Sequence, residues 1–233
     1  MTQLQDATFC VVDTETTGID PLNDKLCEIA FVLTTREQVI FMAETMINPG
    51  IPIPPEASAV HHIIDRHVAD APAVFPYGIK LPARQCYVAH NAEFDSAFLP
   101  QLARTPWLCT MRLARHVLPG LGSYKNQYLR YLLKLEVELP EGALPHRALP
   151  DAIVTAALLR HPLAKLPPDA PTTVEELVPW THRPCLLTTC YFGQKHRGTP
   201  WADVPKDYLK WMLANCTDLD ADTRFTAEHH LKR

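Results

Sequence analysis

The sequence predicts an α/β fold, with a mixed sheet flanked by helices, followed by a small C-terminal module. Runs rich in β-branched and aromatic residues open the chain, helical and short apolar segments then alternate as far as about residue 163, and prolines cluster beyond that point. A chain of 233 residues is long enough for one domain with a buried core and an appendage.

The first three runs, residues 8–13, 26–34 and 39–47, are expected to form consecutive strands. The turns between them are short, so the strands should form an antiparallel meander. From residue 56 onward, helical segments are expected to continue to a fourth strand at residues 86–88.

Two helices are expected beyond the fourth strand. One contains Phe98, Leu99 and Leu102, and the other begins near Pro150 and continues through the apolar run 153–159. Proline is tolerated in a first helical turn, because its missing N–H has no partner inside the helix there. Strands and helices that alternate in this way indicate a sheet with helices on its faces.

Prolines after residue 162 mark the expected division of the chain. We expect a first domain at residues 1–165, a proline-rich linker at 166–184 with a short helical segment at 174–178, and a C-terminal module at 185–233. Within the module, residues 185–192 have the composition of a strand and residues 208–213 that of a short helix.

Two acidic residues, Asp13 and Glu15, end the first apolar strand. Residues i and i+2 of a strand point to the same side, so the two carboxylates share one face. At a buried strand end they would repel each other and lose hydration, which indicates that a cation lies between them. The alternative is that both side chains simply reach solvent.

Two later segments offer further ligands. Asp95 follows the strand at 86–88 in the first turns of a helix, and Asp151 lies near the start of the helix through 153–159, with His146 just before it. Taken singly, Asp95 could be a solvated helix residue, Asp151 could interact with the helix dipole, and His146 could be a surface histidine. The segments together, in this order and beside comparable apolar elements, favour a shared site.

The order Asp-x-Glu, His-Asn-x-x-Phe-Asp and His-x-x-x-x-Asp resembles the three motifs of the DEDD exonucleases, the DnaQ-like superfamily, in its histidine-containing branch. The resemblance extends to residues 192–205, which look like the short module that such proteins carry after the nuclease domain. It implies a ribonuclease H-like, five-stranded mixed sheet and the hydrolysis of DNA from its 3′ end to nucleoside 5′-monophosphates.

By the same resemblance, the four acids would hold two divalent ions. Asp13, Glu15 and Asp151 would hold the ion that generates hydroxide, Asp13 would bridge to a second ion near Asp95, and His146 would take the proton from the attacking water. Mg²⁺ or Mn²⁺ is expected, because these hard ions prefer carboxylate oxygen and water. A neutral imidazole can accept a proton at neutral pH.

Six residues are candidates for contact with the terminal nucleotide: Thr16, Gly18, Ile19, His90, Asn91 and Phe94. The first three follow the acidic strand end, where backbone N–H groups could meet the nucleotide and Ile19 could wedge against a base. The last three match the second motif of the family, which implies such contact. The alternatives are a turn glycine with an apolar flank, and a strand-to-helix turn that Asn91 or Phe94 only shapes.

The net charge of −4 argues against extensive nonspecific wrapping of DNA. Without the four motif acids, the 26 acidic residues fall to 22 and equal the 22 basic ones, so contacts with the substrate should be few and local. The basic segment 112–134 could track phosphates or form a solvated helix face. Near Trp201, Tyr208 and Trp211, the loop at 195–197 could bind phosphate or duplex DNA, but a small aromatic core with solvated basic residues is favoured.

No apolar run is long enough to span a membrane, and the N-terminus lacks a signal-peptide pattern. Seven cysteines without a Cys-x-x-Cys pair indicate reduced thiols and a cytoplasmic location. The resemblance to the DEDD exonucleases further implies a repair exodeoxyribonuclease whose partner is DNA with a free 3′ end, single- or double-stranded. One alternative is an exoribonuclease. The other is a noncatalytic nucleic-acid-binding module, and the intact set of four acids and a histidine disfavours this second alternative.

Overall fold

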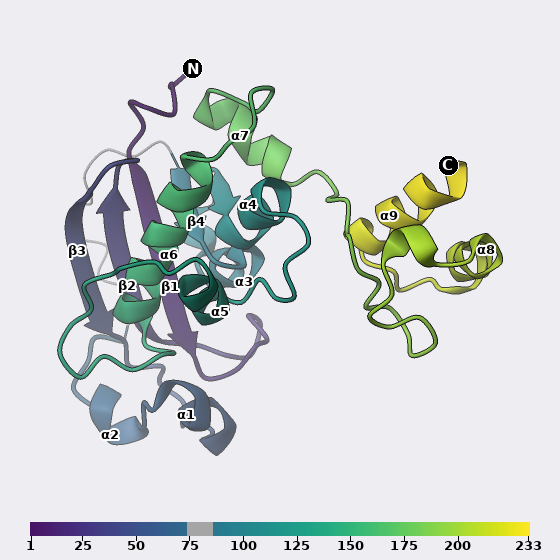
Figure 1. Ribbon diagram of the computed structural model, residues 1–233. Coiled ribbons are helices and arrows are strands. Elements are labelled where there is room, and N and C mark those ends of the chain that lie inside the picture. The colour runs from purple at the N-terminus through teal and green to yellow at the C-terminus, as the bar shows by residue number, and fades with distance from the viewer. Residues whose placement is uncertain (74–85) are drawn as a thin grey trace.

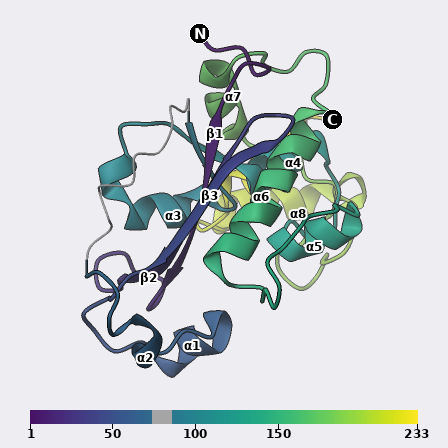
Figure 2. The same cartoon turned by 90° about the vertical axis from the view of Figure 1, so that its left-hand side faces the viewer.

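The computed structural model of the chain describes residues 1–73 and 86–233. A five-stranded sheet, in the order β3-β2-β1-β4-β5, has helices on both faces (Figures 1 and 2). The strands are β1 (Phe9–Thr16), β2 (Leu26–Thr34), β3 (Val39–Met46), β4 (Cys86–Ala89) and β5 (Trp107–Cys109). β1 to β3 form the expected antiparallel meander, while β4 and β5 run parallel to β1. The predicted α/β fold with a mixed sheet is confirmed.

The central strand β1 is buried on both faces, which explains its unbroken apolar run. Phe9 and Val11 pack in the core cluster that contains much of α6 (Ala148–Leu163). Cys10 and Val12 face the opposite cluster, which Leu99 completes. Both layers of the core therefore hold β1 in place, and its carboxyl end is a rigid base for the side chains that follow.

Between β3 and α6 in the sequence, the described residues form the α-helices α1 (Pro55–His61), α2 (Asp65–Val68), α3 (Ala92–Phe98), α4 (Thr110–Val117) and α5 (Asn126–Leu132). The helical segments expected to reach β4 end with α2 in the described part, and residues 74–85 lie outside the described residues. The helix expected through Leu102 ends at Phe98. A 3₁₀ helix, Pro100–Leu102, follows it, because Pro100 has no N–H to continue an α-helix.

The expected linker contains α7 (Val174–Thr181), which extends beyond the predicted helical segment at 174–178. Val174 and Leu177 are buried in the same core cluster as Phe9 and α6. This helix therefore packs as part of the first domain, and the boundaries 1–165, 166–184 and 185–233 stay a prediction. In the described part of the chain, no helix has both the length and the apolar character that crossing a membrane requires.

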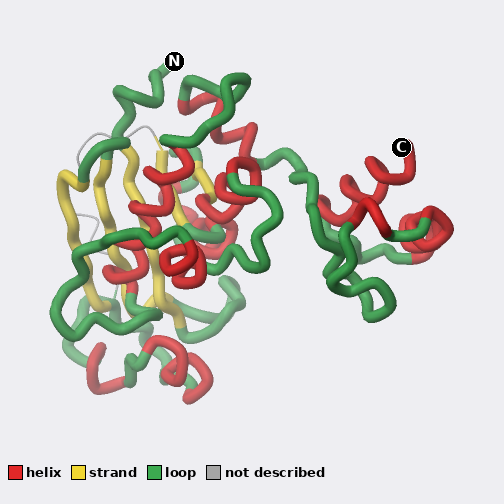
Figure 3. The backbone as a smooth tube through the Cα atoms, in the orientation of Figure 1, coloured by secondary structure: helices red, strands yellow, loops and turns green. Residues whose placement is uncertain are grey.

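The C-terminal module has a core of its own, built by the 3₁₀ helix Trp201–Asp203, α8 (Lys206–Asn215) and α9 (Ala221–Lys232). The helix predicted at 208–213 is confirmed within α8. The strand predicted at 185–192 is wrong: this segment is loop in Figure 3, with an isolated bridge between Thr189 and Pro200. Its C-terminal part exchanges a few backbone bonds with residues 198–201, which form no described strand, and its N-terminal part donates to α9 side chains.

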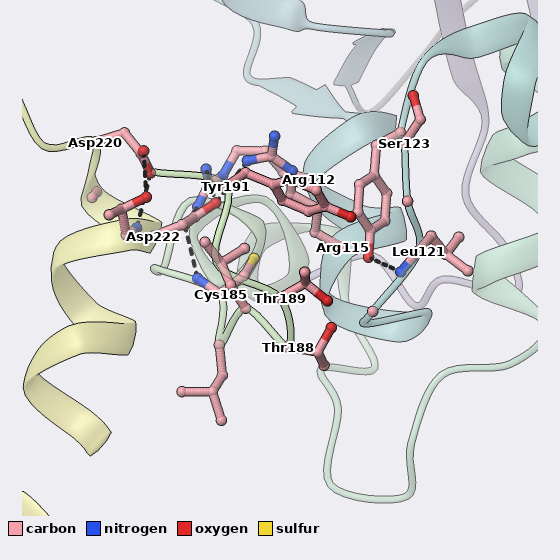
Figure 4. A pocket seen from close by; sticks show the side chains of 17 residues that line it. Arg112, Arg115, Leu121, Ser123, Cys185, Thr188, Thr189, Tyr191, Asp220 and Asp222 are labelled. Atoms are coloured by element: carbon pink, nitrogen blue, oxygen red, sulfur yellow. Dashed lines mark hydrogen bonds and ion pairs between the residues drawn. The ribbon is translucent and has the colours of Figure 1, made fainter. Parts of the chain in front are cut away.

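A buried carboxylate ties the module to the first domain (Figure 4). Asp222 of α9 is paired with Arg112 Nη2 at 3.1 Å and with Arg115 Nη1 at 2.7 Å, and the Cys185 N–H donates to it at 2.9 Å. We call these four residues the Asp222 ion-pair site. Arg112 and Arg115 belong to the basic segment for which DNA contact and a solvated face were considered. In the structure, these two arginines hold α9 against α4.

Candidate active site

Three carboxylates meet at the carboxyl end of β1. Asp13 and Glu15 lie on one face of this strand, and Asp151 lies in the first turn of α6, where its N–H donates to the Arg147 carbonyl at 3.1 Å. One ligand oxygen from each of the three acids lies within 4.8 Å of the others. The sequence pattern predicted such a cluster. The packing of α6 across β1 and β2 brings Asp151 close to Asp13 and Glu15.

The fourth acid, Asp95, comes from α3 and is buried. The Thr14 hydroxyl donates to its Oδ1 at 2.8 Å, which fixes the carboxylate beside the end of β1. Asp95 lies outside the cluster of three, but its charge raises the pKa of both Asp13 and Glu15. We call Asp13, Glu15, Asp95 and Asp151 the acidic cluster.

The acidic cluster is electrostatically unfavourable in the metal-free protein. Burial, reinforced by the neighbouring acids, raises the pKa of Glu15 to about 8 and that of Asp13 well above its ordinary value. Burial also raises the pKa of Asp95 and of Asp151. Among the described residues, none of the four forms an ion pair with lysine or arginine. An all-oxygen donor set that lacks an ion-pair partner suits a hard divalent cation.

The carboxylate of Asp151 is held at both oxygens. Gln127 Nε2 of α5 donates to Oδ1 at 2.6 Å, and the His146 N–H donates to Oδ2 at 3.0 Å. Asn126 joins the same helices, through the Thr155 hydroxyl at 2.8 Å. Sequence reasoning missed Gln127, because an amide on a helix face carries no motif of its own.

His146 is exposed and has a φ of 58°, in the left-handed region. Its backbone bond to Asp151 places it at the edge of the acidic cluster, and its charge lowers the pKa of Asp151, although burial has the larger, opposite effect. The described side chains make no hydrogen bond to its ring. This position leaves the imidazole free to meet a water or a substrate atom.

The turn before α6 is anchored by Glu28 of β2, a residue that sequence reasoning also missed. Glu28 is buried and accepts from Arg147 Nε at 3.0 Å, from Arg147 Nη2 at 2.5 Å and from the Ala148 N–H at 2.9 Å. A charged residue inside the apolar run of β2 was the available signal, because a buried acid needs a partner. The anchor fixes the residue that directly follows His146.

The turn after β1 holds three of the proposed substrate contacts. The Thr16 hydroxyl donates to the Gly18 carbonyl at 2.5 Å, so it already has a partner. A Cβ on Gly18 would lie 2.3 Å from an Asp24 oxygen, and glycine is therefore required where that carboxylate closes the turn. Ile19 is 86% exposed and remains available to a ligand.

The three substrate-contact candidates of the second motif have different surroundings. His90 is bonded at both ring nitrogens, to Thr110 Oγ1 at 2.9 Å and to the Tyr124 carbonyl at 2.7 Å, and burial lowers its pKa to about 4. Asn91 is exposed at φ 73° and starts α3, while Phe94 packs on Phe98. A role of His90 in substrate contact would therefore be indirect, through α4 and the loop before α5.

Comparison with known proteins places this geometry in context. A family model described as an exonuclease (RNase_T) matches residues 10–159. Exodeoxyribonuclease 10 of Escherichia coli (strain K12) is 36% identical over 225 residues, which span 95% of this chain and 98% of that protein. The similarity thus includes the C-terminal module, which lies beyond the family model.

Solved structures agree with the sequence matches. A structure of exonuclease X in complex with 5′ overhanging duplex DNA has a TM-score of 0.66 and 35% identity, covering 74% of this chain and 99% of that one. E. coli exonuclease I in complex with a dT13 oligonucleotide, at a TM-score of 0.56 and 17% identity, shares the fold. The expected ribonuclease H-like sheet and the resemblance to the DEDD exonucleases are confirmed, and within that family the chain resembles bacterial exodeoxyribonuclease X.

Proposed function

The chain belongs to the DnaQ-like exonuclease family, and on this premise we propose that it is a metal-dependent exodeoxyribonuclease that releases nucleoside 5′-monophosphates from the 3′ end of DNA. The observation that carries the proposal is the acidic cluster, whose three meeting carboxylates form no ion pair with a lysine or arginine among the described residues. The names of exodeoxyribonuclease 10 and of the DNA-bound exonuclease X support DNA as the polymer.

We assign the metal ligands residue by residue. Asp13, Glu15 and Asp151 would hold one divalent ion, and Asp13 together with Asp95 would hold a second, with Mg²⁺ or Mn²⁺ as the ions that suit carboxylate oxygen. When bound, such ions lower the pKa of a water and stabilise the charge of the departing oxygen. The fixed carboxylate of Asp151 orients the site, because Gln127 and the His146 backbone hold both of its oxygens.

We assign the general base to His146. Its exposed ring stands at the edge of the acidic cluster, where it can take a proton from the attacking water and release it to solvent. The ion pair between Glu28 and Arg147 fixes the turn before α6, which contains His146. Ile19, Asn91 and Phe94 would contact the terminal nucleotide, with Thr16, Gly18 and His90 shaping the surfaces that carry them.

A role in DNA repair in the cytoplasm completes the proposal. All seven cysteines are free, which fits a reducing compartment. RNA is the competing polymer, since discrimination depends on contacts to a 2′-hydroxyl.

The decisive experiment incubates the full chain with 5′-labelled DNA and with an RNA of matched sequence, in Mg²⁺, in Mn²⁺ and in chelator. We expect a ladder that shortens from the 3′ end of DNA with either metal, and no products in chelator. Faster digestion of RNA would make the protein an exoribonuclease. A folded protein that releases no mononucleotide with either metal would refute the nuclease assignment.

His146→Ala tests the base. The variant should lose roughly two to four orders of magnitude in turnover, the usual scale of a general base, and keep its affinity for DNA. His67→Ala, at another exposed histidine, is the matched control and should act as the wild type. Near-normal turnover of His146→Ala would remove this residue from the mechanism.

A further inference from the structure

The C-terminal module carries an open cavity of about 810 Å³ that is separate from the acidic cluster. Residues from the loop before the 3₁₀ helix and from α8 line it, including Lys195, His196, Tyr208 and Trp211. We call it the Trp211 pocket. It mixes aromatic rings with a cationic rim, which distinguishes it from the core of the module.

Helix α8 builds one wall of the pocket. Its Leu209 and Met212 are buried in the core of the module, Tyr208 packs against the edge of that core, and both Tyr208 and Trp211 line the pocket. These two residues are three apart, so their rings are neighbours, stacked at 29° with centroids 5.5 Å apart. Trp211 remains 51% exposed. An indole of this size left half in water offers a flat stacking face.

The loop builds the opposite wall. Gly193 has a φ of 61°, and a Cβ there would lie 3.0 Å from the Tyr208 hydroxyl, so glycine lets the loop close on this ring. Lys195 Nζ lies 5.9 Å from the Tyr208 ring centroid, and the His196 ring meets the same ring edge-on at 4.5 Å. The sequence favoured a small aromatic core here. Trp201 alone of the three expected aromatics is fully buried in it.

We propose that the Trp211 pocket binds an unpaired base of a single DNA strand, with Trp211 stacking on the base and Lys195 contacting an adjacent phosphate. Aromatic faces flanked by cations bind single strands in this way, because every base has a π-face and every nucleotide a negative charge. The proposal rests on the DNA-directed function proposed above and assigns a second contact to the same substrate.

The position of the pocket suits such a contact. In Figure 1 the loop before α8 points in the same direction as the carboxyl end of β1, although the module lies to one side of the sheet. The Asp222 ion-pair site holds the module in this orientation. The proposal requires that a strand whose 3′ end enters the acidic cluster continue upstream toward the module.

The test measures the affinity of the full chain for a fluorescent oligo(dT), by anisotropy, with Ca²⁺ as the divalent ion and gels to exclude turnover. Trp211→Ala should weaken binding about 10-fold, the scale of one base stacked on an aromatic ring. Lys195→Ala should weaken binding less. It should also reduce the slope of log affinity against log salt concentration by about one released counterion. Trp211→Phe should restore most of the affinity, because it keeps a stacking face.

Matched controls are Phe225→Ala and Lys206→Ala, which alter exposed residues of the same module outside the pocket. Both should bind as the wild type. Equal weakening by the controls, or wild-type affinity in Trp211→Ala, would overturn the proposal. The second outcome would leave the pocket to a protein partner instead.

A second substrate separates this proposal from the nuclease assignment. The p-nitrophenyl ester of thymidine 5′-phosphate is too small to reach from the acidic cluster to the module, so its hydrolysis by the wild type tests the nuclease site alone. The effect of Trp211→Ala should grow with the length of the oligonucleotide. A loss of the same size on the ester and on long oligo(dT) would contradict a separate DNA contact.

Discussion

Two sites in this protein contain buried carboxylates, and they are balanced in opposite ways. At the Asp222 ion-pair site, one carboxylate with a 2% exposed side chain meets two arginines and a backbone N–H. In the acidic cluster, four carboxylates meet no arginine or lysine among the described residues. A chain that supplies two arginines to a single buried acid, yet none to four, leaves the second site to a cation from solution.

Glu28 stands between these two cases. Its charge raises the pKa of Glu15, as that of a cluster member would, but Arg147 and the Ala148 N–H occupy both of its oxygens. By its partners it belongs with Asp222, although it lies opposite Glu15 in the sheet. The comparison therefore classifies an acid by its countercharge rather than by its position.

The largest effect is expected at Asp13. Asp13→Asn removes a ligand that both proposed ions share, so turnover of DNA should fall by at least about three orders of magnitude. In the metal-free protein, the free energy of unfolding should rise by about 1 kcal/mol, because a raised pKa means that the ionised group is unfavourable there. Denaturant titration and mononucleotide release measure the two quantities.

The control for Asp13→Asn is Asp70→Asn, at an exposed acid, which should alter neither activity nor stability. If Asp13→Asn lowered the stability of the metal-free protein by several kcal/mol, the acidic cluster would be a structural site like that of Asp222. The comparison between the two would then fail.

Asp222→Asn should show the reverse pattern. Removing the charge leaves Arg112 and Arg115 without their partner, and breaking a buried pair costs about 3 kcal/mol of unfolding free energy. The loss should appear in denaturation followed by tryptophan fluorescence, since Trp201 lies in the core of the module. Hydrolysis of the small thymidine ester should persist, as α9 contributes nothing to the acidic cluster.

Asp218→Asn, at an exposed acid of the same module, provides the baseline for that measurement. Wild-type stability in Asp222→Asn would mean that the two arginines do not hold the module. Loss of ester hydrolysis in a folded Asp222→Asn protein would couple the two sites and remove the contrast between them.

Glu28→Gln sharpens the classification with a smaller effect. The neutral amide weakens the anchor of the turn before α6, so unfolding free energy should fall by about 2 kcal/mol, the scale of a hydrogen bond to a charged group. Turnover should fall about 10-fold, because less exact placement of His146 and Asp151 should raise the activation free energy by about 1.4 kcal/mol. An activity loss as complete as that of Asp13→Asn, at unchanged stability, would make Glu28 a metal ligand.

Local sequence patterns were enough to predict most of the fold and the clustering of the acidic residues. The strands followed from β-branched runs, and the helix start at Asp151 followed from Pro150 and the apolar run behind it. The segment 185–192 failed because its composition suits a strand, whereas strand formation also needs a neighbour, and the described fold provides one bridge. Helix α9 was not foreseen, since its polar sequence lacks a clear apolar period.

Tertiary partners were beyond reach of the sequence for a physical reason. Gln127 orients Asp151. Asp222 pairs with Arg112, more than one hundred residues away in the sequence. Neither pairing follows from local spacing. His90 looked like a substrate contact because it belongs to a motif, yet its ring is bonded to Thr110 and to the Tyr124 carbonyl. A motif fixes the identity of a side chain, and packing fixes its direction.

The smallest effect expected is the stabilisation of the fold by bound metal, which should depend on pH. In the metal-free protein the pKa of Glu15 rises from 4.5 to about 8, so the folded state binds a proton that the unfolded state has lost between these values. Stability should therefore fall as pH rises through this window. Mg²⁺ or Mn²⁺ binds the ionised cluster, and at ten times its Kd it should stabilise the fold by about 1.4 kcal/mol, a few degrees in Tm.

Melting curves from pH 5 to pH 8 on the wild type and on Asp13→Asn, with and without metal, separate the contributions. The metal increment should be largest at the alkaline end and should shrink in Asp13→Asn, because a bridging carboxylate is gone while the Asp222 ion-pair site is untouched. An increment that is independent of pH and of Asp13 would place the ion elsewhere. The acidic cluster would then have to be balanced by protons alone, and its difference from the Asp222 site would lie in protonation rather than in metal.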